Sequence, residues 1–214
     1  LFARQTRYRL DAEMIRDQAL DISGLLVRQI GGPSVRPYQP SGYYSQLNFP
    51  KRTYKHDKGN SQYRRGLYTH WQRTFLHPML KAFDAPTREE CTAQRPRSNT
   101  PLQSLNLLND PSFVEAARTF AAGILSSPAK ADHQRIRSAF ESVVLRQPTH
   151  RELMILEQLL IETREGYSGE PERGLELVKV GLNQAGKQCP PAELGAWTAV
   201  TRALFNLHET ITRY

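Results

Sequence analysis

The sequence has only two cysteines, Cys91 and Cys189, among its 214 residues. So few cysteines exclude a disulfide-rich scaffold and a zinc site with four cysteine ligands. The two thiols either form one disulfide, which would close a long loop and stabilise the fold by about 4 kcal/mol, or lie apart as small buried side chains. Their positions in the sequence leave both alternatives open.

The sequence also lacks an apolar run of the roughly 20 residues that a membrane-spanning helix requires. We therefore expect no membrane span in this chain. It begins at Leu1 rather than at a methionine, and its first residues are basic, without the apolar core of a signal peptide. These features predict that the chain is a fragment of a larger protein.

Acidic residues are in the minority: the chain has 29 Lys and Arg but only 21 Asp and Glu, which gives a formal net charge of +8. Such a charge favours acidic partners. The basic residues are nevertheless scattered, as in Arg64–Arg65, without a long basic block or a nucleic-acid-binding motif. We therefore expect a solvated basic surface and no specific nucleic-acid partner.

Hydrophobic periodicity predicts a mainly α-helical bundle. A first helix is expected over Leu10–Leu26, with Asp11 as its N-cap. Further helices are expected over 101–109, 111–126, 133–147, 150–167, 174–182 and 192–214. We expect a single helical domain over 1–214. Its natural sub-division, if any, is a loop-rich half over 1–127 and a helical half over 128–214.

A long irregular segment, Gly31–Asn60, interrupts the helical pattern. Segments of this length are usually functional loops or disordered, but aromatic side chains can pin such a loop to the core. The aromatic residues here are Tyr38, Tyr43, Tyr44, Phe49 and Tyr54. The next stretch, Tyr63–Thr74, fits a short strand or a helical turn, and its aromatic and Thr content favours a strand. With an extended piece over Glu90–Arg95, it would form at most a small two-stranded ribbon.

The densest polar chemistry lies in Asp84–Asp110, which matches no catalytic motif. Here an Arg-rich segment leads into two helices that each begin with a proline, as Pro101 and Pro111 show. Asn99 or Thr100 is the expected cap of the first helix, and Gln103 would reach back to it as in a capping box. Asp110 is the expected cap of the second. Within the first helix, three leucines fall on one face, namely Leu102, Leu105 and Leu108.

Asp84 belongs to two competing interpretations of this segment. In the first, Asp84 and Glu89 or Glu90 form paired carboxylates for acid–base chemistry on a sugar, with Arg88 or Arg97 lowering one pKa. In the second, which we favour, Asp84 caps a turn and Arg97 forms an ion pair with Asp84 or Asp110.

A third interpretation is an anion site. The N-terminus of the helix at Pro101, beside Arg95 and Arg97, could bind a sulfate or a carboxylate. The candidate ligand-binding residues are Asp84, Arg88, Arg95, Arg97, Asn99, Thr100 and Gln103.

Resident cofactors are not expected. The neighbouring histidines, His56, His70 and His77, lack the spacing of a helical zinc site. The chain also has no Cys-x-x-Cys-His motif, so it attaches no c-type haem.

Several stretches together resemble one protein family. They follow one another along nearly the whole chain and read RLDAEMIRDQAL, YRRGLYTHWQRT, FDAPTREECTAQRPRSNTPLQSLNLLNDPSFVEAAR and ELGAWTAVTRALFNLHETITR. Their combination resembles the planctomycete-type C-terminal domain of unknown function, which follows a companion domain in large, often cytochrome c-containing proteins of Planctomycetes and Verrucomicrobia. We expect the family's N-terminal portion, a helical segment before RLDAE, to lie outside this chain.

The resemblance implies no established activity. It implies export across the cytoplasmic membrane to the periplasm or another extracytoplasmic space, and it implies a companion domain and a haem c domain as partners within the parent protein. We therefore expect an extracytoplasmic docking or ligand-binding module, with acidic polysaccharide as a candidate ligand. The alternative is part of an extracytoplasmic oxidoreductase or carbohydrate-active enzyme whose active site is completed by other domains.

Overall fold

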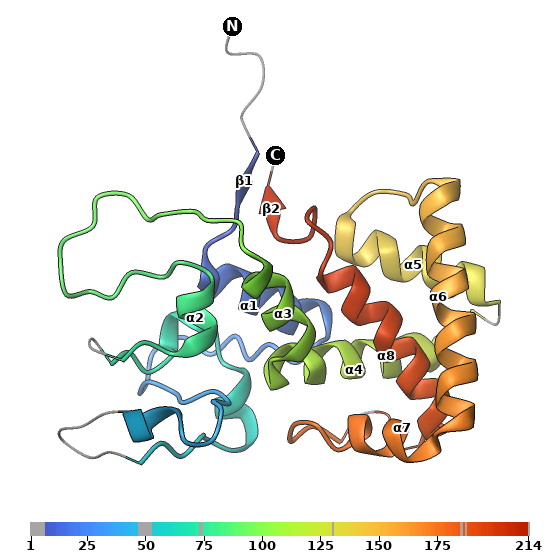
Figure 1. Cartoon of the computed structure of the whole chain (residues 1–214), viewed down its shortest axis with the longest axis horizontal. Helices are drawn as coiled ribbons and strands as arrows, with labels where there is room; N and C mark the ends of the chain where they lie inside the picture. The colour runs from blue at the N-terminus through green and yellow to red at the C-terminus, as the bar shows by residue number, and fades with distance from the viewer. Residues whose placement is uncertain are drawn as a thin grey trace, which may run out of the picture.

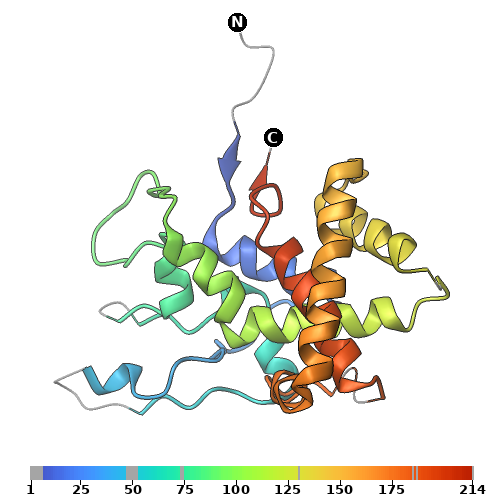
Figure 2. The same ribbon diagram turned by 45° about the vertical axis from the view of Figure 1, so that its right-hand side comes forward.

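The computed structural model describes residues 7–46, 53–72, 75–129, 131–184, 186 and 188–213. Within these residues it confirms a mainly α-helical chain with one two-stranded ribbon. The helices are α1 (Ala12–Ile22), α2 (Pro78–Ala82), α3 (Pro101–Asn109), α4 (Pro111–Leu125), α5 (Asp132–Val144), α6 (His150–Gly169), α7 (Pro171–Val178) and α8 (Pro191–Phe205). Figures 1 and 2 show α4–α8 gathered on one side of the molecule and the long irregular segments on the other.

The core forms where α8 packs against α4, with α6 and α7 also in contact with α8. Alanines in α4 allow the two helices to approach closely. Thr201 of α8 lies at this contact, and its hydroxyl donates a hydrogen bond to the Ala117 carbonyl of α4 at 2.9 Å. The hydrophobic side chains of α8 that have no exposed surface are Leu194, Ala196, Trp197, Val200 and Leu204. Burial along this helix therefore makes α8 the centre of the core.

The two proline-led helices begin where the sequence predicts, but their caps differ. The Asp110 side chain accepts a hydrogen bond from the Ser112 N–H of α4 at 2.8 Å. The Thr100 side chain makes no such bond at the start of α3. Gln103 reaches back past Thr100 and donates to the Ser98 carbonyl at 3.2 Å instead. The expected capping box in α3 is therefore replaced by a longer-range contact.

This difference predicts unequal costs for two matched substitutions. Asp110→Ala should lower the free energy of unfolding by about 1 kcal/mol, because it removes a side-chain cap. Thr100→Ala should change it by less than about 0.5 kcal/mol, because no cap bond is lost. Urea unfolding of both variants measures the difference. Equal losses would show that the two helix starts are equivalent.

The ribbon lies elsewhere than the sequence predicts. It pairs β1 (Tyr8–Arg9) with β2 (Thr212–Arg213) in antiparallel register, with Tyr8 opposite Arg213. The expected long helix over 192–214 is therefore wrong at its end, because α8 stops at Phe205 and a turn leads into β2. Figure 1 shows β1 and β2 side by side.

The expected strand over Tyr63–Thr74 is also wrong in its described part. Two short 3-10 helices, Gly59–Tyr63 and Gly66–Tyr68, occupy this region, with only single bridges from Arg64 to Val27 and from Thr69 to Val35. Gly66 explains the compact path, because a Cβ added there would lie 2.9 Å from the Glu13 Cα of α1. Arg73 and Thr74 lie outside the described residues. Glu90–Arg95 is irregular rather than a strand.

Aromatic contacts hold the long loop, as expected. Tyr43 packs on Phe75 with ring centroids 4.5 Å apart, and Tyr44 meets Tyr54 edge-on at 5.2 Å. Phe49 lies outside the described residues. Such pairs stabilise beyond the apolar area that they bury, so this irregular segment is tied to the fold.

The remaining predictions concern the end of α1, the two cysteines and the membrane span. α1 ends at Ile22, earlier than predicted, and Gly24 follows with a positive φ of 74°. Cys91 and Cys189 are both free thiols, which decides against the disulfide. No helix in the described part of the chain is both long and apolar enough to cross a membrane.

Candidate functional site

Asp84, the first candidate residue, lies at the base of the loop between α2 and α3. It follows α2 by two residues and has a left-handed conformation with a φ of 59°, which Asp tolerates better than most residues. Its carboxylate accepts hydrogen bonds from the Ser98 N–H at 2.7 Å and from the Ser98 hydroxyl at 2.8 Å. The two ends of the loop are thereby joined through one side chain.

Arg9 of β1 completes this junction. Its guanidinium is 9% exposed and donates to the Asp84 carboxylate at 2.7 Å and to the Phe83 carbonyl at 3.1 Å. It also donates to the Ser98 carbonyl. Gln103, which is 2% exposed, donates to the Ser98 hydroxyl at 3.1 Å. We call these four residues, Arg9, Asp84, Ser98 and Gln103, the loop clasp.

The loop clasp sets the charge state of Asp84. Burial alone would raise the pKa of its carboxyl. The hydrogen bonds from Ser98 and Arg9 outweigh burial and hold this pKa below its usual value. Asp84 is therefore a carboxylate engaged by its neighbours and not an acid with a raised pKa of the kind that glycoside hydrolysis needs. Glu89 and Glu90 lie exposed on the loop and do not join it.

Arg95 connects the same loop to α1. It makes two hydrogen bonds to the Glu13 carboxylate, at 2.7 and 3.1 Å, and lies 3.7 Å from Asp11. The hydrogen bonds to Glu13 raise the pKa of Arg95. Two carboxylates thus already neutralise this cation, so it adds little to an anion site at the start of α3.

Arg88 and Arg97 stack on aromatic rings. The Arg97 guanidinium lies 4.4 Å from the centre of the Tyr8 ring, and Arg213 lies 4.1 Å from the same ring. Arg88 lies 3.8 Å from the Trp71 ring. The expected ion pair of Arg97 with Asp84 or Asp110 is wrong, because Asp84 is bonded to Arg9 and Asp110 caps α4.

Asn99 and Thr100, the last two candidates, are exposed at the start of α3. The structure therefore separates the seven candidate residues by role. Asp84 and Gln103 belong to the loop clasp, Arg95 binds α1, and Arg88 and Arg97 stack on aromatic rings.

Sequence reasoning missed a buried polar cluster around Glu115. This α4 side chain has no exposed surface and accepts hydrogen bonds from the Tyr63 hydroxyl at 2.8 Å and the Asn183 N–H at 2.5 Å. Arg118, one turn later and 1% exposed, donates to the Asn183 carbonyl at 2.7 Å. Gly181 lies so close that any side chain there would meet the Glu115 carboxylate. In the sequence, the signal for this cluster is a Glu and an Arg one turn apart in a largely apolar helix.

Sequence reasoning also did not predict the structural roles of Arg16 and His77. Arg16 of α1 is 1% exposed and donates to the Arg64 and Gln62 carbonyls, each at 2.6 Å. His77 donates from Nε2 to the Tyr38 carbonyl at 2.7 Å, and burial lowers the pKa of His77 to about 4. Both side chains hold irregular backbone in place, which is a structural role.

The geometry therefore defines a class of protein, a helical domain whose most concentrated polar groups fix loops to helices. A comparison with known families matches residues 1–160 to the family described as PSD1, protein of unknown function (DUF1553). The chain belongs to this family, which confirms the resemblance. No curated protein and no solved structure matches the chain.

Proposed function

We propose that this chain is a non-catalytic docking module of a larger extracytoplasmic protein that carries haem c on another domain. The location and the haem rest on the family resemblance. The non-catalytic assignment rests on one observation, the loop clasp. Its hydrogen bonds engage Asp84 with Arg9 and Ser98, whereas a catalytic carboxylate must keep an oxygen available for substrate.

The surface that supports docking is the outer face of α3 with the adjoining ribbon. Leu102 and Leu105, one turn apart, are 56% and 54% exposed. The leucine face predicted from the sequence is thus turned outward at these two positions. Arg97, which precedes α3 in the chain, and Arg213 of β2 both stack on the Tyr8 ring. Neither arginine makes an ion pair within the described residues. We call Arg97, Leu102, Leu105 and Arg213 the α3 surface.

An acidic segment of a protein partner is the occupant that fits this surface. The net charge of +8 and the two guanidiniums favour acidic side chains. Two exposed leucines favour a partner that brings apolar side chains as well. A polysaccharide would satisfy the charges but would leave the leucines without apolar contacts, so a protein segment is the better match.

Chemical-shift mapping with a synthetic peptide of Glu and Leu tests this proposal. We expect shifts at the α3 surface, and an affinity that falls as salt rises. Arg97→Gln with Arg213→Gln should weaken binding about fivefold, since exposed charge pairs contribute up to about 1 kcal/mol. Leu102→Ser should also weaken it, because it removes exposed apolar area.

The matched control is Arg137→Gln with Arg151→Gln, two exposed arginines of α5 and α6 whose loss changes the net charge equally. If both double variants bound the peptide equally weakly, the loss would come from the change in net charge alone. That result would contradict binding at the α3 surface. Shifts at the α3 surface with a sulfated oligosaccharide but not with the peptide would show that the partner is a polysaccharide instead.

A further inference from the structure

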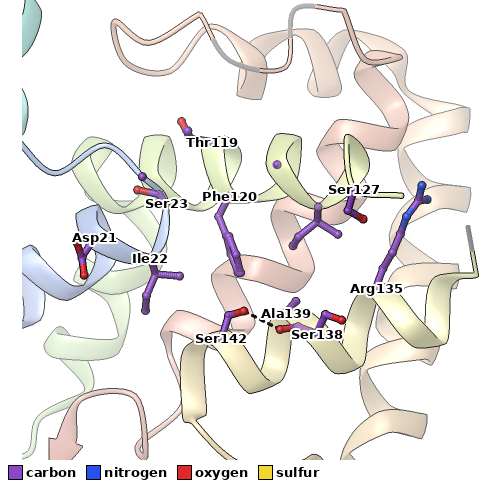
Figure 3. A pocket seen from close by; sticks show the side chains of 13 residues that line it. Asp21, Ile22, Ser23, Thr119, Phe120, Ser127, Arg135, Ser138, Ala139 and Ser142 are labelled. Carbon is purple, nitrogen blue, oxygen red and sulfur yellow. Dashed lines mark hydrogen bonds between the residues drawn. The ribbon is translucent and has the colours of Figure 1, made fainter. Parts of the chain in front are cut away.

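A second surface feature is a groove that shares no residue with the α3 surface. It lies between the C-terminal end of α1, the outer face of α4 and α5, and it has a volume of about 370 Å³. Figure 3 shows Phe120 projecting into its middle, with Arg135 and Ser127 at one end and Asp21 at the other. Its volume falls within the range of small-molecule sites, near the lower limit.

The lining is rich in hydroxyl groups. Thr119, Ser127, Ser138 and Ser142 all border the groove. The Ser142 hydroxyl donates to the Ser138 carbonyl at 2.8 Å, so its oxygen can still accept a hydrogen bond. The Thr119 hydroxyl oxygen is buried without a hydrogen-bond partner. Figure 3 shows this side chain on the side of α4 that faces away from Phe120, so its hydroxyl does not point into the groove. The hydroxyls available to a ligand in the groove are therefore those of the serines.

Arg135 supplies an unsatisfied donor at one end of the groove. Its side chain is 18% exposed and its Nε is buried without a partner. Its charge is partly compensated, because Asp132, which also pairs with Arg164 at 2.6 Å, lies 3.9 Å away and Nη2 donates to the Leu125 carbonyl at 3.5 Å. The C-terminal end of α4 adds a negative partial charge at the same place. This end of the groove therefore offers hydrogen-bond donors without a strong attraction for anions.

Phe120 provides the apolar part of the site. It is half-buried and its ring stacks on Phe205 at a centroid distance of 6.1 Å and an interplanar angle of 10°, which fixes its orientation. A fixed aromatic surface surrounded by hydroxyls suits a ring that is apolar on its faces and polar around its edge. From this combination we infer that the groove between α1, α4 and α5 binds an uncharged polyhydroxylated ring, a neutral sugar or a cyclic polyol.

Titration of the chain with maltose, cellobiose and myo-inositol, followed by amide chemical shifts, tests this inference. We expect at least one of the three to shift the amides of Phe120, Ser138 and Ser142. Its affinity should not change between low and high salt, because no net charge is bound. Arg135→Gln should weaken binding about tenfold, the equivalent of one hydrogen bond to a charged group.

A blocking variant makes the test specific. A Cβ added at Gly123 in the groove meets nothing within 4 Å, and the same holds for Gly166 on α6. Gly123→Val should therefore fold and fill the groove, whereas the matched control Gly166→Val should bind like wild type, and neither change costs helix propensity. Failure of all three ligands to bind, or equal binding by Gly123→Val, would overturn the inference. A preference for glucuronate that disappears at high salt would also overturn it.

Discussion

Replacing Arg9 with methionine is expected to lower the free energy of unfolding by about 3 kcal/mol, as found when one partner of a buried, hydrogen-bonded pair is removed. Arg9 donates hydrogen bonds to Asp84, Phe83 and Ser98. Methionine keeps the length of the side chain but donates none of them, so the Asp84 carboxylate loses its counterion and two carbonyls lose a donor. Chemical denaturation at neutral pH measures the loss.

The control is Arg28→Met, which breaks an ion pair with Asp21 in which the arginine side chain is 76% exposed. Exposed pairs contribute little, so the expected loss is less than about 1 kcal/mol. Losses of the same size in the two variants would contradict a special role for Arg9.

The pH dependence gives the Arg9 prediction a second readout. Because the folded pKa of Asp84 lies below its unfolded value, the stability from this group is present above the ordinary pKa of 3.8 and is lost as the pH falls through the folded pKa. Wild type should lose this part of its stability on acidification, and Arg9→Met should lose less of it.

Gly181→Ala is expected to destabilise the fold by about 3 kcal/mol, through two effects. Gly181 has a φ of +85°, where an L residue other than glycine loses about 1 kcal/mol or more. The added methyl group would also occupy the place of the Glu115 carboxylate. Moving that carboxylate would break its bonds to Tyr63 and Asn183, and buried groups left unsatisfied cost about 1–3 kcal/mol. Thermal and urea unfolding measure the total.

Gly31→Ala separates the two effects. Gly31 has a similar φ of +78°, but a Cβ there meets nothing within 4 Å. It should therefore show only the backbone effect of about 1 kcal/mol. A Gly181→Ala variant no less stable than Gly31→Ala would mean that the Glu115 cluster does not pack as described.

The parts of the fold that the sequence predicts well are those with local causes. The start of α3 and the start of α4 are both marked by a polar residue before a proline, a signal contained within a few neighbouring residues. The ribbon has no such signal, because it pairs Tyr8 with Arg213 from opposite ends of the chain. The strand expected over Tyr63–Thr74 failed for the related reason that β propensity needs a partner strand.

The candidate site shows the same limit. Asp84 was identified as central, but its partner Arg9 lies 75 residues earlier, and the sequence offered Arg97 as the nearer choice. The cluster around Glu115 was not predicted, because the partners of Glu115 come from the distant segments around Tyr63 and Asn183. Residue types therefore indicated where polar chemistry is concentrated, but only the packing of remote segments shows that it is structural.

Amide hydrogen exchange at Ser98 tests whether the loop clasp closes the Asp84–Asp110 segment. The Ser98 N–H donates to Asp84 at 2.7 Å, whereas Thr92 lies on the exposed part of the same loop. We expect the Ser98 amide to exchange about a hundredfold more slowly than a free peptide, which corresponds to a local opening free energy of about 3 kcal/mol. We expect Thr92 to exchange rapidly, and Asp84→Ala to abolish the protection of Ser98. Free-peptide exchange at Ser98 in the wild-type protein would contradict the account.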